Sequence, residues 1–286
     1  MGVNIKVSSL EQKGETPFEV FSRMLFIAKT ITDHLISLKS GFVVNDPVSF
    51  MLKLGNNMLT VAETFQRIVI LKRDSNSAYA LFRIQADYLA TLLLIFESKS
   101  EEETKFRYLL YLIDGLTQRV DSLKEKPDYN GSISTQDYEA LINQMTEAED
   151  NAKEVLDYCL KEVEKLSYKT INPTLFGKIL KNRQWRYKEF TDASSKTDSF
   201  SWKDLYSLID AREDISSFIS LCSHFVHGLV NSLLSDNKEE NFEPIVSFNA
   251  CLIDRYVKML KSLFGKEKIN DILKFYLLGI TIKVCD

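Results

Sequence analysis

The placement of the prolines constrains the fold of this chain more than any other feature. Pro17, Pro47 and Pro173 each directly follow a Thr, Asp or Asn, the residue types that cap helix N-termini. Proline suits the first helical turn because the N–H that it lacks would have no partner there. Only 10 glycines and 5 prolines occur in 286 residues, so few breakers remain inside helices. Long helices are therefore predicted.

The capping signals and apolar spacing together predict an all-α, multi-helix bundle of about eight to ten helices. The predicted helices cover, in order, residues 17 to 41, 47–72, 75–97, 101–123, 135–166, a short one from 173, one from 202, 215–234, 243–264 and 268–280. The triplet Gly55-Asn56-Asn57 favours a loosening of the second helix. No strand-like alternation or internal repeat stands out, so we expect a single helical domain over residues 1–286.

Charge and cysteine usage indicate a cytoplasmic protein. The chain has 36 Lys and Arg against 40 Asp and Glu, which gives a formal charge of −4. This net charge does not favour binding of nucleic acid by the protein as a whole, although a local basic patch could still bind it. The four cysteines are far apart in the sequence, which is typical of buried thiols in a reducing compartment. The first residues lack the apolar segment of a signal peptide.

The most apolar stretch, residues 78–96, is predicted to be a core helix. Arg83, Gln85 and Asp87 stand near its middle, where each would be costly in a bilayer. No membrane association is therefore expected.

Two polar stripes mark a candidate site. Arg83, Asp87 and Thr91 recur at i, i+4 and i+8 on a helix that is apolar nearly all round, so an Arg and a carboxylate should lie inside the protein or at the floor of a cleft. A second stripe falls within a sector of about 80° on the predicted helix 215–234. It consists of Ser216, Ser220, Ser223, His227 and Asn231, with His224 beside it. If the stripes face each other, Arg83, Asp87, Ser223 and His227 would converge on one site.

Two interpretations of these stripes stay open. As a catalytic site, Arg83 would hold a phosphate, Asp87 would orient Arg83, and His227 would act as acid or base. RNA or a nucleotide would then be the partner. As a structural feature, the same residues would be a buried ion pair and a satisfied helix histidine in a non-catalytic interaction or dimerisation module. A homodimer is expected.

No cofactor or metal is expected. His224 and His227 stand at i, i+3, but no third ligand accompanies them. The sequence contains no Walker A, GxGxxG or GxSxG motif.

A local basic and aromatic cluster is a candidate nucleic-acid contact, because cations can grip the backbone while aromatic rings stack on bases. Its alternative interpretation is a solvated helix end with an anchoring tryptophan. The candidate residues are Lys178, Lys181, Arg183, Trp185, Arg186 and Lys188, with Tyr187 among them.

Both polar helices resemble those of a helical bacterial family of unknown function, over residues 60 to 235. Residues 81–87, Leu-Phe-Arg-Ile-Gln-Ala-Asp, resemble its Leu-Arg-x-x-x-Glu helix. Residues 218–228, Phe-Ile-Ser-Leu-Cys-Ser-His-Phe-Val-His-Gly, resemble its Tyr-x-x-Leu-Ser-x-x-x-Val-His-Gly helix. Here Asp87 replaces the Glu, and Phe218 replaces the Tyr.

That family is similar at the fold level to HEPN proteins, helical dimers that include RNA-cutting toxins and antiviral defence factors. The resemblance implies a HEPN-like ribonuclease or nucleotide-binding protein in stress or phage defence. The HEPN signature, an Arg four to six residues before a His on one helix, is absent. An Arg from another helix would have to replace it, and Arg83 is the candidate.

Overall fold

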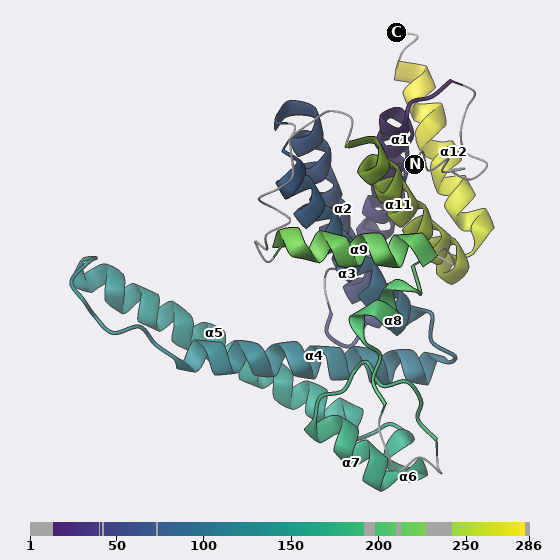
Figure 1. Cartoon of the computed structure of the whole chain (residues 1–286). Coiled ribbons are helices and arrows are strands. Elements are labelled where there is room, and N and C mark those ends of the chain that lie inside the picture. Colours follow the sequence, from purple (N-terminus) through teal and green to yellow (C-terminus); the bar gives the residue numbers. More distant parts are fainter. Residues whose placement is uncertain are drawn as a thin grey trace. The chain divides into compact units, whose positions relative to one another are not determined.

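A computed structural model describes residues 14–39, 41, 43–72, 74–191, 198–209, 213–226 and 242–283. In this part of the chain the structure has 11 α-helices, nine of seven or more residues, and no strand. The predicted all-α bundle is confirmed (Figure 1).

The described residues form two compact units. The core unit comprises the described residues up to Glu97 and from Trp202 onward, and the hairpin unit comprises Ser98–Ser201. The expectation of one helical domain stays a prediction, since compact units can also fold together as one domain.

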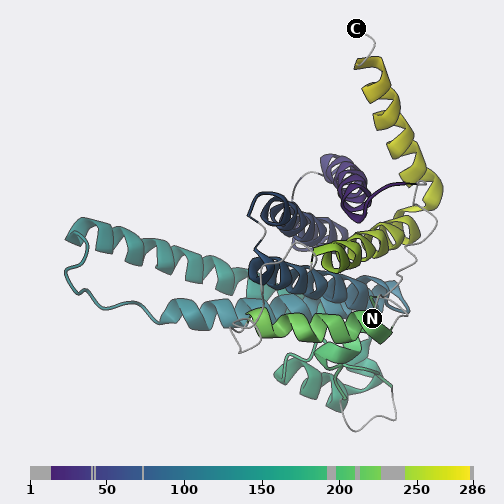
Figure 2. The same ribbon diagram turned by 45° about the horizontal axis from the view of Figure 1, so that its top comes forward.

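The core unit is built around its most apolar helix. Its elements are α1 (Pro17–Ser37), α2 (Pro47–Arg67), η1 (Ile68–Lys72), α3 (Ser75–Phe96), α8 (Trp202–Tyr206), α9 (Glu213–Val226), α11 (Phe242–Phe264) and α12 (Lys266–Lys283). Helix α3 packs against α2, α9 and α11, and Figure 2 shows α1, α2, α3 and α11 side by side. Every residue from 89 to 96 is buried.

Helix α3 alone among the described helices is long and apolar enough to span a membrane, by length and composition. In its most apolar window 61% of the residues are buried inside the protein. A core helix passes the same test, so the expectation of no membrane stays a prediction.

The hairpin unit has α4 (Glu101–Lys124), α5 (Thr135–Val163), α6 (Tyr168–Ile171) and α7 (Pro173–Lys181). Helices α4 and α5 pack antiparallel along their length (Figure 1). Of the segment 189–200 only residues 189–191 and 198–200 are described, and Ser199 forms a single bridge with Tyr187.

Side-chain caps start the helices where the sequence indicates. Thr16 accepts a hydrogen bond from the backbone N–H of Glu19, and the Glu19 carboxylate accepts from Thr16 N at 2.8 Å, which is a complete capping box. Asp46 and Asn172 cap α2 and α7 with their side chains, which accept from the backbone N–H of Val48 and Leu175, and a proline follows each cap. The predicted starts of these helices are confirmed.

The predicted loosening at Gly55-Asn56-Asn57 is wrong, because α2 runs through these residues without a break. Gly55 instead makes room for the fully buried ring of Tyr256 on α11. A Cβ atom at position 55 would lie 2.6 Å from the Tyr256 Cζ atom. Tertiary packing therefore explains this glycine better than local flexibility does.

Candidate functional site

Aromatic packing fixes α9 against α3. The ring of Phe218 lies 5.3 Å from that of Phe82 and stacks on Phe248 of α11 at 4.5 Å. Tyr79 of α3 stacks on Phe225 at 4.5 Å. Phe218 is thus part of a packed aromatic cluster. It stands where the family that this helix resembles has a tyrosine, and it has no hydroxyl group to contribute to the polar stripe.

Arg83 joins the two polar stripes. Its Nε donates a hydrogen bond to Ser223 Oγ at 2.8 Å, and its Nη1 pairs with Asp87 one turn along α3. The stripes of α3 and α9 therefore face each other at Ser223, which is the condition for the predicted site. Ser220, by contrast, is exposed and donates to the backbone of Ser216 at 2.9 Å.

The short helix α8 completes the site with two aromatic residues. The hydroxyl of Tyr206 donates to Asp87 Oδ1 at 2.8 Å. The Arg83 guanidinium carbon lies 4.6 Å from the centre of the Tyr206 ring and 5.8 Å from that of Trp202, within cation–π range. Three helices therefore converge on one guanidinium group.

Burial sets the electrostatics of this group of residues. It lowers the pKa of Arg83, while the nearby Tyr206 and Cys222 act in the opposite direction. An arginine nevertheless stays charged in proteins. Burial raises the pKa of Cys222 to about 12, so this thiol is protonated at neutral pH and is a poor nucleophile.

Part of the Arg83 side chain remains open to a ligand. The side chain is 14% exposed, and within the described residues its Nη2 forms no hydrogen bond, whereas Nε and Nη1 are held by Ser223 and Asp87. The Asp87 side chain is 36% exposed and the Trp202 residue 37% exposed beside it. The site consequently offers N–H donors, a carboxylate and an aromatic face to a ligand.

Sequence reasoning found part of this site. The structure brings Arg83, Asp87 and Ser223 together, whereas His227 and Asn231 lie outside the described residues. Trp202 and Tyr206 were missed, since nothing in their local sequence connects them with α3. Their only signal was the predicted helix start near residue 202.

The basic and aromatic cluster of the hairpin unit is organised differently from the prediction. Its cations stay at the surface, with Lys178 and Lys181 exposed and the side chains of Arg183 and Lys188 each 38% exposed. Trp185, however, is only 7% exposed and packs edge-on against Tyr111 at 5.0 Å. Trp185 cannot stack on a base in this arrangement, because its ring is already covered. The anchoring interpretation fits this residue.

Arg107 of α4 holds this segment in place, and sequence reasoning missed it. Its guanidinium is buried, donates to the carbonyl oxygen of Tyr187 at 2.8 Å, and binds Glu103 through Nε and Nη2 at 3.1 and 2.8 Å. The i, i+4 spacing of Glu103 and Arg107 could have indicated a pair, but such pairs are usually exposed. The Arg186 guanidinium lies 5.8 Å from the Trp185 ring centre.

No group of three potential metal-ligating side chains occurs among the described residues. A comparison of the chain with models of known protein families, with curated proteins and with solved structures found no match.

Proposed function

We propose that the core unit binds a phosphate group of RNA or of a nucleotide at Arg83, with Trp202 beside the attached base. One observation carries the proposal: the Arg83 side chain keeps an exposed fraction of 14% while its Nε and Nη1 are held by Ser223 and Asp87. A planar fork of N–H donors suits phosphate oxygens, and a fixed fork loses little entropy on binding.

The neighbouring aromatic side chains favour a nucleotide over a simple anion. Trp202 is partly exposed, and its ring is nearly parallel to that of Tyr206, with 5.9 Å between centroids. Base–aromatic stacking contributes about 1–3 kcal/mol per base. A phosphate on Arg83 and a base on Trp202 would together use both exposed groups.

Cleavage of RNA would require a further acid or base. Asp87 already accepts hydrogen bonds from Arg83 and Tyr206, which suits it to orient Arg83. His227 is the sequence candidate for proton transfer. If His227 supplies this group, the resemblance to HEPN proteins suggests that the protein is a ribonuclease in stress or phage defence.

Binding is tested with a labelled single-stranded RNA oligonucleotide, followed by fluorescence anisotropy, and with nucleoside monophosphates as competitors. Arg83→Lys keeps the charge but removes the fork, so we expect binding to weaken about tenfold, which corresponds to 1.4 kcal/mol. Trp202→Ala should weaken it about fivefold or more. Lys274→Gln, which removes an exposed charge on α12, is the matched control.

Cleavage is tested separately by incubating wild type and His227→Ala with total RNA, after both show equal helicity. Cleavage by wild type alone supports the nuclease form of the proposal. Binding without cleavage leaves a nucleotide-binding protein. If the wild type does not bind RNA or nucleotides, or if Arg83→Lys binds as tightly as wild type, the proposal is wrong.

The second candidate is a non-catalytic interaction module. It is favoured by the closed part of the network, in which Asp87, Ser223 and Tyr206 tie α3, α8 and α9 to one guanidinium. Arg83→Gln distinguishes the two. The module predicts lost stability or assembly, whereas the binding site predicts a folded protein that has lost its ligand.

A further inference from the structure

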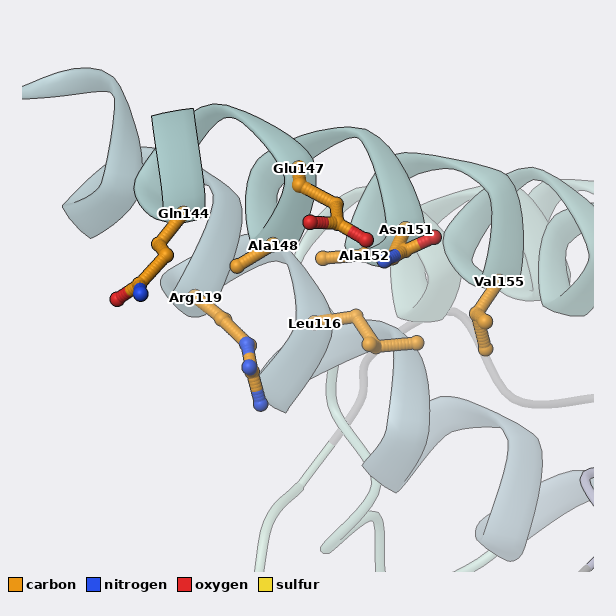
Figure 3. Close-up of a pocket in the computed structure, with 8 residues that line it drawn as sticks. All are labelled: Leu116, Arg119, Gln144, Glu147, Ala148, Asn151, Ala152 and Val155. Atoms are coloured by element: carbon orange, nitrogen blue, oxygen red, sulfur yellow. The ribbon is translucent and has the colours of Figure 1, made fainter. Parts of the chain in front are cut away.

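A groove runs between α4 and α5 of the hairpin unit (Figure 3). It has a volume of about 410 Å³ and involves no residue of the core unit. Its floor is apolar and its rim is polar. Its lining includes Leu116, Arg119, Glu147, Ala148, Ala152 and Val155.

The apolar floor is only half covered. Ala152 is buried in the seam between the two helices, but Leu116, Ala148 and Val155 beside it remain partly exposed. Farther along α5, Leu141 is 39% exposed. Two antiparallel helices bury only those sides of their apolar stripes that face each other. The apolar side chains that remain exposed are usually covered by further helices, as in a four-helix bundle. The two alanines leave room for a helix to approach closely.

The two charges on the rim have no partner in the part of the chain that the structure describes. Arg119 on α4 and Glu147 on α5 are exposed, and neither has a hydrogen-bond or ion-pair partner among the described residues. The adjacent edge of α5 differs, because there Glu149 pairs with both Lys126 and Lys153, at 2.9 and 2.7 Å. Glu149 is thus paired, and the groove itself carries one exposed charge of each sign without a partner among the described residues.

We propose that this groove is the interface of a homodimer, independently of the function proposed for Arg83. Two grooves related by a twofold axis present the same patch to each other. Arg119 of one copy then faces Glu147 of the second copy, and Glu147 of the first faces Arg119 of the second. One cation and one carboxylate flanking an apolar floor are complementary to their own copy, which favours this occupant over an unrelated helix.

The test measures the oligomeric state of the full chain by sedimentation velocity with Arg119→Glu, Glu147→Arg and an equimolar mixture of both. We expect a wild-type dimer, and each single reversal should weaken dimerisation at least tenfold because like charges then oppose each other. The mixture should restore a dimer, since one variant carries two carboxylates at the groove and the other two guanidinium groups. Pairing within one chain cannot produce that recovery.

Asp157→Arg is the matched control. Asp157 is exposed on the same helix, and at 100° per residue it lies on the side of α5 opposite the groove. This variant should dimerise like wild type. A monomeric wild type at 100 μM protein, single reversals that dimerise normally, or a mixture that stays monomeric would each overturn the proposal.

Discussion

Replacing Gly55 with alanine puts a methyl group into the space that the Tyr256 ring occupies. The added Cβ would lie 2.6 Å from Cζ and 2.8 Å from Cε2 of Tyr256, distances that real Cβ contacts do not show. The ring is fully buried, and its hydroxyl lies 3.1 Å from Thr32 Oγ1, so it cannot move without losing that hydrogen bond. Tyr256 or α2 must therefore shift.

The expected cost follows from three contributions. Overpacking a core costs about 1–3 kcal/mol, and loss of the Tyr256–Thr32 hydrogen bond adds about 1 kcal/mol. The higher helix propensity of alanine offsets about 0.5–1 kcal/mol. We therefore expect Gly55→Ala to lower the free energy of unfolding by about 1–3 kcal/mol.

The assay is guanidinium denaturation followed by circular dichroism, with Gly177→Ala as control. Gly177 lies on α7, is exposed, and a Cβ there would meet no atom within 4 Å. This variant should gain about 0.5–1 kcal/mol. Adding Tyr256→Leu to Gly55→Ala should cost less than the sum of the single changes. A Gly55→Ala protein as stable as wild type, or strictly additive changes, would refute the role assigned to this contact.

Three further predictions concern other polar groups. Hydrogen bonds from Lys153 and Lys126 lower the pKa of Glu149 to about 2. The ionised Glu149 therefore stabilises the folded protein above its ordinary pKa of 4.5, and this stabilisation is lost as the pH falls from 4.5 toward 2. The melting temperature of wild type should exceed that of Glu149→Gln at pH 7, and the difference should vanish near pH 2. Arg107→Met removes the buried guanidinium that donates to Glu103 Oε1 and to the carbonyl oxygens of Trp185 and Tyr187, so unfolding should become easier by about 3–5 kcal/mol, and an unchanged denaturation midpoint would contradict this. Asn249 is fully buried, and neither of its side-chain polar atoms has a hydrogen-bond partner among the described residues, so Asn249→Leu should stabilise the core unit by about 1 kcal/mol in the same assay. Destabilisation would indicate a polar contact at this position.

The candidate site shows which contacts can be predicted from local sequence. The i, i+4 spacing of Arg83 and Asp87 predicted their proximity, because helix geometry alone sets it. The contact between Arg83 and Ser223 was predicted only on condition that the two stripes face each other, which the structure bears out. Tyr206 could not be anticipated, since 119 residues separate it from the carboxylate to which it donates.

The sequence by itself determined the fold class and the helix starts, because capping, proline placement and apolar periodicity act within a few residues. The tertiary structure decided which polar groups meet and why particular residues stand where they do. Gly55 looks like a flexible point in sequence and is a packing requirement in space, and Trp185 looks like a stacking surface and is an anchor. Burial and contacts between distant segments depend on how helices pack, and no local pattern encodes that.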